Sequence, residues 1–140
     1  MSRLLVALQF GLMALIALRL RAEAIGVTFH VLLVLGVAVG AWALAVNRPG
    51  NINIRPDPHP QGTLVTGGPY RWIRHPMYLS VLLVMAAFAL GGDAWQWGAW
   101  AALAAVLAAK ARREERGLAI LHPGYEEYRR RTRAIVPFVF

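Results

Sequence analysis

Residues 67–78, GGPYRWIRHPMY, organise the chain, because they place a dense group of polar and conformationally restricted residues directly before an uncharged apolar run, 79–90. Pro76 has no N–H and a fixed φ suited to the first turn of a helix, so we predict that a helix begins there with His75 at its mouth. The free N–H groups and the positive dipole end of such a helix favour a carboxylate or phosphate beside Arg74. The stretch therefore predicts a ligand site at the start of an apolar helix.

The same residues also have a purely structural interpretation. Arg71 and Arg74 would then extend toward lipid phosphates at a membrane boundary. Trp72 and Tyr78 would belong to the aromatic belt, and Pro76 would only start a helix. Because composition alone favours this second interpretation, the site hypothesis depends on the rest of the chain.

The composition is typical of one membrane domain. The chain has 140 residues, of which 58% are hydrophobic and 16% charged, with a mean hydropathy of +0.48. It is too short for several domains and too apolar for an ordinary soluble one. The absence of cysteine excludes disulfides and thiolate chemistry. The four histidines have no ligand spacing such as HExxH, so we predict no metal site.

We expect an all-α integral membrane protein with about four transmembrane helices, the last two a tight hairpin, followed by a short cytoplasmic C-terminal helix. The apolar segment 24–46 has 23 residues, about 34 Å as a helix, which is enough to cross a hydrocarbon core of roughly 30 Å. The apolar segment 4–18 resembles a signal peptide, but the arginines that follow it favour a membrane helix. Two shorter apolar arms within 77–109 predict the hairpin.

The positive charges indicate the orientation. With four spans, thirteen of the fifteen Lys and Arg residues share one side, against Arg19 and Arg21 on the other. The positive-inside rule then places both termini and the active site in the cytoplasm, at a bacterial inner membrane. We expect one domain, 1–140, made of two N-terminal transmembrane helices (1–46), a cytoplasmic loop with the RHPxY motif (47–76), a helical hairpin (77–109) and a cytoplasmic tail that closes the cofactor site (110–140).

The tail region carries eight of the fifteen cations, between residues 110 and 133. Because it follows an apolar helix directly, we expect anionic membrane lipids and not nucleic acid as its partner. Lys110 is four residues before Glu114, and the simplest interpretation of this charged run is a solvated helix face.

Gly36 and Gly40 have GxxxG spacing, which is compatible with a dimer and equally with packing within the chain, so the oligomeric state stays open. The roles of His30 and of loop 47–66 also stay open.

Three blocks of sequence follow one another in an informative order. They are TLVTGGPYRWIRHPMYL (63–79), EERGL (114–118) and HPGYEEYRRRTRAIVPF (122–138). Together they resemble the isoprenylcysteine carboxyl methyltransferase family and its phospholipid methyltransferase relatives. That family's pattern is GPYxxxRHPxY, an apolar hairpin, EExxL, and a tail with two tyrosines three apart before an IP or VP ending. The chain departs from it in its HPG turn and in Thr132, where an aliphatic residue is usual.

The resemblance implies an integral membrane enzyme that uses S-adenosylmethionine without a Rossmann domain, and the sequence has no GxGxxG. It implies O-methylation of the carboxylate of an isoprenylcysteine-like or other lipophilic acceptor, either a small molecule or a prenylated one. The alternative is N-methylation of a phospholipid of the phosphatidylethanolamine type. A hypothesis from another class is a noncatalytic membrane protein whose basic tail recruits lipids.

The resemblance also implies roles for individual residues. Arg74 or Arg133 would orient an acceptor carboxylate, whereas an amine acceptor would need Glu115 or His75 as a base, so the expected catalytic residues are Arg74, Glu115 and Arg133. The helix mouth would receive the methionyl carboxylate, a glutamate the ammonium or ribose hydroxyls, and an aromatic ring the adenine or sulfonium. Which glutamate does which stays open. The expected cofactor-binding residues are Gly68, Tyr70, His75, Pro76, Tyr78, Glu114, Glu115, Tyr125 and Tyr128.

Overall fold

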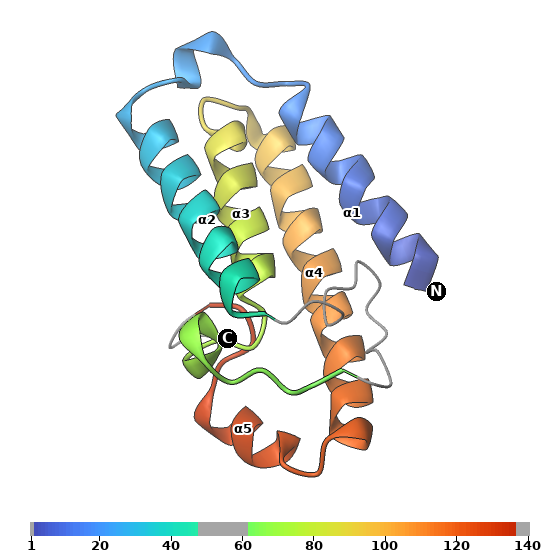
Figure 1. The fold of residues 1–140 in the computed structure, drawn as a ribbon. Helices are drawn as coiled ribbons and strands as arrows, with labels where there is room; N and C mark the ends of the chain where they lie inside the picture. The colour runs from blue at the N-terminus through green and yellow to red at the C-terminus, as the bar shows by residue number, and fades with distance from the viewer. Residues whose placement is uncertain (1, 48–61, 137–140) are drawn as a thin grey trace.

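Four long helices lie side by side, and a fifth, short helix lies beyond one end of them (Figure 1). The computed structural model describes residues 2–47 and 62–136, and within those ranges the chain is helical except for turns, irregular segments such as 62–66, and one isolated β-bridge. The expected all-α fold is therefore confirmed for the described residues. The elements are α1 (Ser2–Ala17), η1 (Ala22–Ala24), α2 (Val27–Val46), η2 (Gly68–Arg71), α3 (Pro76–Ala89), α4 (Ala94–Leu121) and α5 (Tyr125–Arg131).

The order of the long helices across the bundle is α2, α3, α4, α1 (Figure 1). The beginning of α1, the end of α2 and the beginning of α3 lie at the same end of the bundle, and α4 continues past them toward α5. The buried core joins α1, α3, α4 and the tail through residues such as Ile16, Leu82, Leu103 and Ile135. This arrangement brings the three sequence blocks to one end of an apolar bundle.

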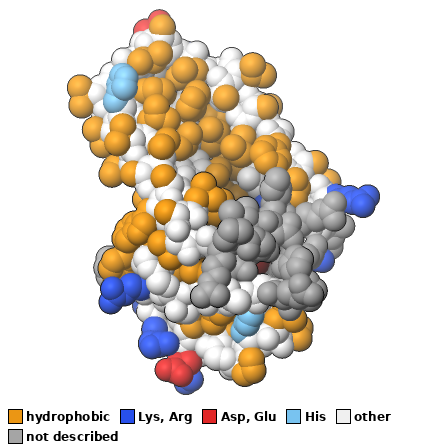
Figure 2. Space-filling model, viewed as in Figure 1, with side chains coloured by type: hydrophobic (Ala, Val, Ile, Leu, Met, Phe, Trp, Pro, Cys, Tyr) orange, Lys and Arg blue, Asp and Glu red, His pale blue; other side chains and the backbone are white. Residues whose placement is uncertain are grey.

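Only α2, among the described helices, is long and apolar enough to cross a membrane by itself. It has 20 residues, whereas α1 has 16 and α3 has 14, about 24 and 21 Å at 1.5 Å per residue. Hydrophobic side chains cover the part of the surface formed by the long helices, and charged ones gather beyond it (Figure 2). The membrane character is thus supported, while the count of four spans stays a prediction.

The start of α2 was predicted too early. The sequence predicts a helix from residue 24, but Ala22–Ala24 form a separate 3-10 turn, and Gly26 has extended backbone at φ −120° and ψ −167°. The residues that follow Glu23 are uncharged and mostly apolar from Ala24 onward, which is why hydropathy alone misplaces the boundary. His30 is exposed, and its Nδ1 lies 2.8 Å from the Gly26 carbonyl oxygen of its own helix start.

The predicted hairpin is formed by α3 and α4. Gly91 turns the chain with a left-handed φ of 70°, and Asp93 caps α4 by accepting a hydrogen bond from the Gln96 N–H at 3.0 Å. The buried Gln96 side chain donates to the carbonyls of Phe88, at 3.0 Å, and Ile16, at 3.2 Å. This side-chain amide therefore links α1 to the hairpin, and the sequence pattern gave no indication of that role.

The two glycines of the GxxxG motif face α3, so the motif serves packing within the chain. The Ser80 hydroxyl donates to the Gly36 carbonyl at 2.7 Å. A Cβ at Gly36 would lie 2.7 Å from Val84 Cγ2 and 3.1 Å from the Ser80 carbonyl oxygen, and one at Gly40 would lie 2.6 Å from Ser80 Oγ. The missing side chains are what let α2 and α3 approach this closely.

We expect Gly36→Ala to destabilise the fold by about 1–3 kcal/mol, because the added methyl group overpacks the α2–α3 contact. The matched control is Gly11→Ala in α1, where a Cβ meets nothing within 4 Å. That substitution should be neutral or stabilising by up to about 1 kcal/mol. Thermal unfolding in detergent measures both, and equal Tm values for the two variants would contradict the close crossing.

Candidate active site

A short parallel β-bridge between Ile73 and Arg133 fastens the tail to the residues that precede α3. Around it, the Arg133 N–H donates to the Trp72 carbonyl at 2.9 Å, and the Arg74 N–H donates to the Arg133 carbonyl at 2.8 Å. The His75 N–H donates to the Ala134 carbonyl at 2.9 Å. Through these bonds the first and third sequence blocks become one unit, against which α4 places the second.

His75 stands at the helix mouth, as predicted, and α3 begins at Pro76. Its ring is buried and stacked on Tyr78, with centroids 5.1 Å apart and planes 6° apart. His75 Nε2 lies 3.2 Å from Glu115 Oε1, and Nδ1 lies 3.6 Å from Glu114 Oε2. The anions beside this helix mouth are therefore the protein's own carboxylates.

Glu115 is the more firmly held of the two acids. Its Oε1 accepts a hydrogen bond from Arg74 Nε at 2.7 Å, and its side chain is only 11% exposed. Burial alone would raise the pKa of this carboxyl, but hydrogen bonds from His75 and Arg74, with their charges, outweigh burial and lower the pKa to about 2. Glu115 is thus a carboxylate at every physiological pH.

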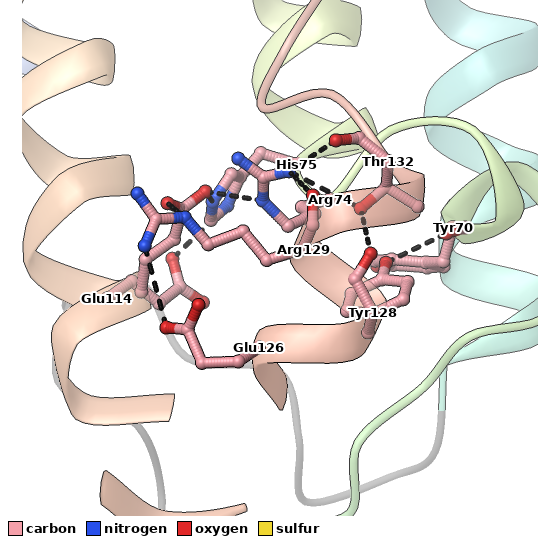
Figure 3. A network of polar contacts seen from close by, with 9 residues as sticks. Tyr70, Arg74, His75, Glu114, Glu126, Tyr128, Arg129 and Thr132 are labelled. Carbon is pink, nitrogen blue, oxygen red and sulfur yellow. Dashed lines mark hydrogen bonds and ion pairs between the residues drawn. The ribbon is translucent and has the colours of Figure 1, made fainter. Parts of the chain in front are cut away.

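Glu114 has a different environment, although it is the neighbouring residue. Its side chain is 32% exposed, and its Oε2 accepts a hydrogen bond from the Tyr78 hydroxyl at 3.0 Å. Figure 3 shows it beside the His75 ring. One acid of the pair is therefore enclosed by Arg74 and His75, and the other is partly open.

Arg74 joins three elements through its guanidinium group (Figure 3). Besides Glu115 on α4, it donates through Nη1 to the Thr132 carbonyl at 2.7 Å and to the Arg129 carbonyl at 3.2 Å. Thr132 also explains one departure from the family pattern, because its buried hydroxyl donates to the Tyr128 carbonyl at 2.7 Å and satisfies an acceptor in the last turn of α5. Sequence reasoning gave no signal for this role.

The two tail tyrosines lie on the inner face of α5, three residues apart as predicted, and both are buried. The Tyr128 hydroxyl donates to the Tyr70 carbonyl at 2.8 Å, whereas the Tyr125 hydroxyl has no hydrogen-bond partner in the described part of the chain. Burial raises the pKa of Tyr70 to about 12, with a contribution from Glu114, and burial likewise raises the pKa of Tyr125 and Tyr128. All three phenols are hydrogen-bond donors at neutral pH.

Two of the predicted site residues do not contribute a side chain to this cluster. Gly68, with φ 55°, packs against α2, where a Cβ would lie 2.6 Å from Val46 Cγ2. The Arg133 side chain is exposed, and only its backbone takes part, through the bridge. The catalytic and cofactor-binding roles of all these residues stay predictions, and most of loop 47–66, with His59, lies outside the described residues.

The solvated-face interpretation of Lys110 was wrong. Its side chain is fully buried, with 2% exposure, and its Nζ donates to Gln9 Oε1 of α1. The charged run of α4 thus begins inside the bundle, one turn before Glu114. Helical spacing could have suggested this, because Leu103, Leu107 and Lys110 fall on one face and all three are buried. The described residues contain no group of three or more side chains that could hold a metal ion.

The chain is 42% identical over 77 residues to the cobalt-zinc-cadmium resistance protein CzcN of Cupriavidus metallidurans, a match that covers 54% of this chain and 36% of that protein. No solved structure matches. Residues 28–120, from the start of α2 through the paired glutamates, match the model of the isoprenylcysteine carboxyl methyltransferase (ICMT) family. The chain therefore belongs to the ICMT family.

Proposed function

We propose that the protein uses S-adenosylmethionine to methylate the carboxylate of an isoprenylcysteine-like or other lipophilic acceptor that reaches the site from the bilayer. Family membership supports methyl transfer. The observation that carries the proposal is the convergence of Glu114, Glu115, His75 and Tyr125 at one end of an apolar bundle. In this proposal the active site faces the cytoplasm, as the distribution of positive charge predicts.

The residues present fit S-adenosylmethionine. Leaving a buried hydroxyl without a partner costs about 1–3 kcal/mol, so the Tyr125 hydroxyl, with none among the described residues, is suited to a ligand acceptor. The partly open Glu114 carboxylate suits an ammonium group or ribose hydroxyls. The stacked rings of His75 and Tyr78 offer an aromatic face for a sulfonium or adenine.

The different environments of the two acids suggest that they have different roles. Glu115 is already engaged by Arg74 and His75, so we assign it to holding the site together. Glu114, bonded to a neutral hydroxyl and partly exposed, is assigned to the cofactor. Arg74, by the same reasoning, positions the tail against Glu115, in addition to any contact it makes with the acceptor.

Bound S-adenosylmethionine would supply an electrophilic methyl carbon, which an acceptor oxygen attacks in line with the departing sulfur. The chain's own task is to hold the acceptor at about 3 Å and to exclude water, and it needs no covalent nucleophile. A carboxylate acceptor is already deprotonated at neutral pH. An amine acceptor would need a base, and Glu115, with its pKa lowered to about 2, is a poor one. Of the two candidate bases for an amine acceptor this leaves His75, whereas a carboxylate acceptor needs no base.

The experiment that tests the proposal is methyl transfer by the detergent-purified protein from methyl-tritiated S-adenosylmethionine. N-acetyl-S-farnesylcysteine and phosphatidylethanolamine are offered separately as acceptors. We expect label in the farnesylcysteine that base releases as methanol, since a methyl ester is base-labile. Base-stable label in the phospholipid would point to the amine acceptor instead. Label in neither, with a folded protein, would contradict the proposal.

Tyr125→Phe should raise the KM for S-adenosylmethionine about tenfold, because it removes only the hydroxyl assigned to the cofactor. Its Tm should stay equal or rise, because no protein partner is lost. Tyr128→Phe is the matched control, and there the loss of the bond to the Tyr70 carbonyl should lower Tm. An unchanged KM in Tyr125→Phe would remove this hydroxyl from the cofactor site.

A further inference from the structure

The proposed chemistry uses only part of the stretch 67–78. Arg74 and Tyr78 turn inward and bond to the paired glutamates. Arg71 and Trp72, by contrast, are exposed and take no part in that cluster. The interpretation of this stretch as a membrane boundary therefore does not hold for the first two residues, but it is still available for the last two.

Trp72 lies against a second exposed tryptophan at the end of α2. Its ring centroid is 5.9 Å from that of Trp42, and each side chain is about half exposed. The Arg71 guanidinium lies 5.7 Å from the centre of the Trp72 ring. A hydrogen bond from Asn47 Nδ2 to the Tyr70 hydroxyl, at 3.4 Å, joins the end of α2 to η2 beside these rings. We call Trp42, Trp72 and Arg71 together the Trp–Arg surface.

The polar groups of the Trp–Arg surface are all donors. An indole N–H and a guanidinium group donate hydrogen bonds and accept none. No hydrogen bond or ion pair joins any of the three side chains to another residue in the described ranges. A ligand that matches this surface is an anion that only accepts hydrogen bonds, and the phosphodiester of a phospholipid is such a group.

An exposed apolar face leads from the Trp–Arg surface along α2. Val27, Val31, Leu35 and Trp42 fall on one side of the helix at 100° per residue, and all four are exposed. They cover about 22 Å of helix length at 1.5 Å per residue. Since α2 packs on α3 at the edge of the bundle, this face points away from the other helices (Figure 1). An acyl chain fits along it.

The arginines of α5 fit a lipid less well, although the sequence predicts the lipid contact in the tail. Arg129 lies 3.5 Å from Glu126, and Arg131 lies 3.9 Å from Glu127, so two of the three already face acids of the same helix. Both tyrosines of α5 are buried, and the helix lies beyond the end of the long helices (Figure 1). Cation, exposed aromatic rings and apolar face occur together at the Trp–Arg surface instead.

We propose that the Trp–Arg surface binds the phosphate group of an anionic phospholipid, whose acyl chains lie along the exposed face of α2. No carboxylate takes part in the surface, so the ammonium group of a zwitterionic lipid has no counter-charge there. The bound headgroup fixes the segment before α3 at the level of the lipid phosphates. This binding needs neither cofactor nor methyl acceptor and is independent of the proposed function.

The test is native mass spectrometry of the detergent-purified protein, freed of co-purified lipid and titrated with dioleoyl phosphatidylglycerol or dioleoyl phosphatidylethanolamine. The wild type should bind the first phosphatidylglycerol about fivefold more tightly, the effect of one cation near an anionic lipid. Arg71→Gln should abolish this preference, and Arg71→Lys should keep most of it. Trp72→Leu should weaken the binding of both lipids and leave the preference.

Arg116→Gln is the matched control, because it removes the same charge from an exposed position of α4 beyond the paired glutamates and should keep the preference. Equal binding of the two lipids by the wild type, or a preference that survives in Arg71→Gln, would overturn the proposal. An equal loss in Arg116→Gln would also overturn it, since the lipid would then respond to net charge alone. S-adenosylhomocysteine binding, which Arg71→Gln should leave at the wild-type value, reports on the proposed function separately.

Discussion

Arg74→Leu is expected to lower Tm by roughly 10 °C and to release residues 132–136 from the start of α3. The substitution leaves the enclosed Glu115 carboxylate without its main cation and takes a donor from the Thr132 and Arg129 carbonyls. Removing one partner of a buried ion pair typically costs about 3–5 kcal/mol. Arg74 and Glu115 meet that description, because their side chains are only 9% and 11% exposed.

Hydrogen exchange of the tail amides shows whether the loss is local. In the wild type, the Arg133 N–H is bonded to the Trp72 carbonyl and should be protected, whereas in Arg74→Leu it should exchange quickly. The control is Arg71→Leu, an exposed arginine whose guanidinium lies 5.7 Å from the Trp72 ring. Unchanged protection in Arg74→Leu would show that the bridge alone holds the tail.

The pH dependence of Tm is a second test of the expected effect of Arg74→Leu. The folded-state pKa of Glu115 is lowered to about 2 from the ordinary value of 4.5. A lowered carboxyl pKa stabilises the fold fully above the unfolded value, and this stability is lost as pH falls from about 4.5 to about 2. In Arg74→Leu the pKa of Glu115 should be closer to its ordinary value, so this part of the acid-dependent loss of Tm should shrink.

The second large effect concerns the paired acids, which should respond differently to the same substitution. Glu115→Ala leaves the Arg74 guanidinium buried without its carboxylate, so Tm and the affinity for S-adenosylhomocysteine should both fall. Glu114→Ala removes a partly open carboxylate bonded to a hydroxyl, so Tm should change little. Its affinity for S-adenosylhomocysteine should fall about ten- to a hundredfold, the value of a hydrogen bond to a charged group.

Thermal unfolding and ligand titration on the same preparations separate these two outcomes. Glu127→Ala, an exposed acid of α5 at 68% side-chain exposure, should leave both quantities at wild-type values. If Glu114→Ala lowers Tm as much as Glu115→Ala and binds ligand normally, the assigned roles of the two acids are exchanged or absent.

Local signals predicted the parts of the site that a single helix or turn determines. Pro76 has only one favourable place in a helix, so the start of α3 and the position of His75 followed from the sequence. The three-residue spacing of Tyr125 and Tyr128 placed both on one face of α5. The turn residues Gly91, Gly92 and Asp93 likewise located the hairpin turn, because their conformational preferences act locally.

Contacts between distant segments could not be read from these patterns. The bridge between Ile73 and Arg133 joins residues sixty positions apart through backbone groups that every residue carries. Thr132 differs from the family pattern, but only the structure shows the carbonyl that its hydroxyl satisfies. Lys110 was misjudged because its neighbours in sequence are charged, whereas its neighbours in space come from α1 and α3.

The central claim is that the cluster around the paired glutamates binds S-adenosylmethionine, and the most direct test is isothermal titration of the detergent-purified protein with S-adenosylhomocysteine. We predict micromolar binding by the wild type and by Glu127→Ala, and strongly weakened binding by Glu114→Ala at an unchanged Tm. Absence of binding by a folded wild type, or equal binding by Glu114→Ala, would contradict the account.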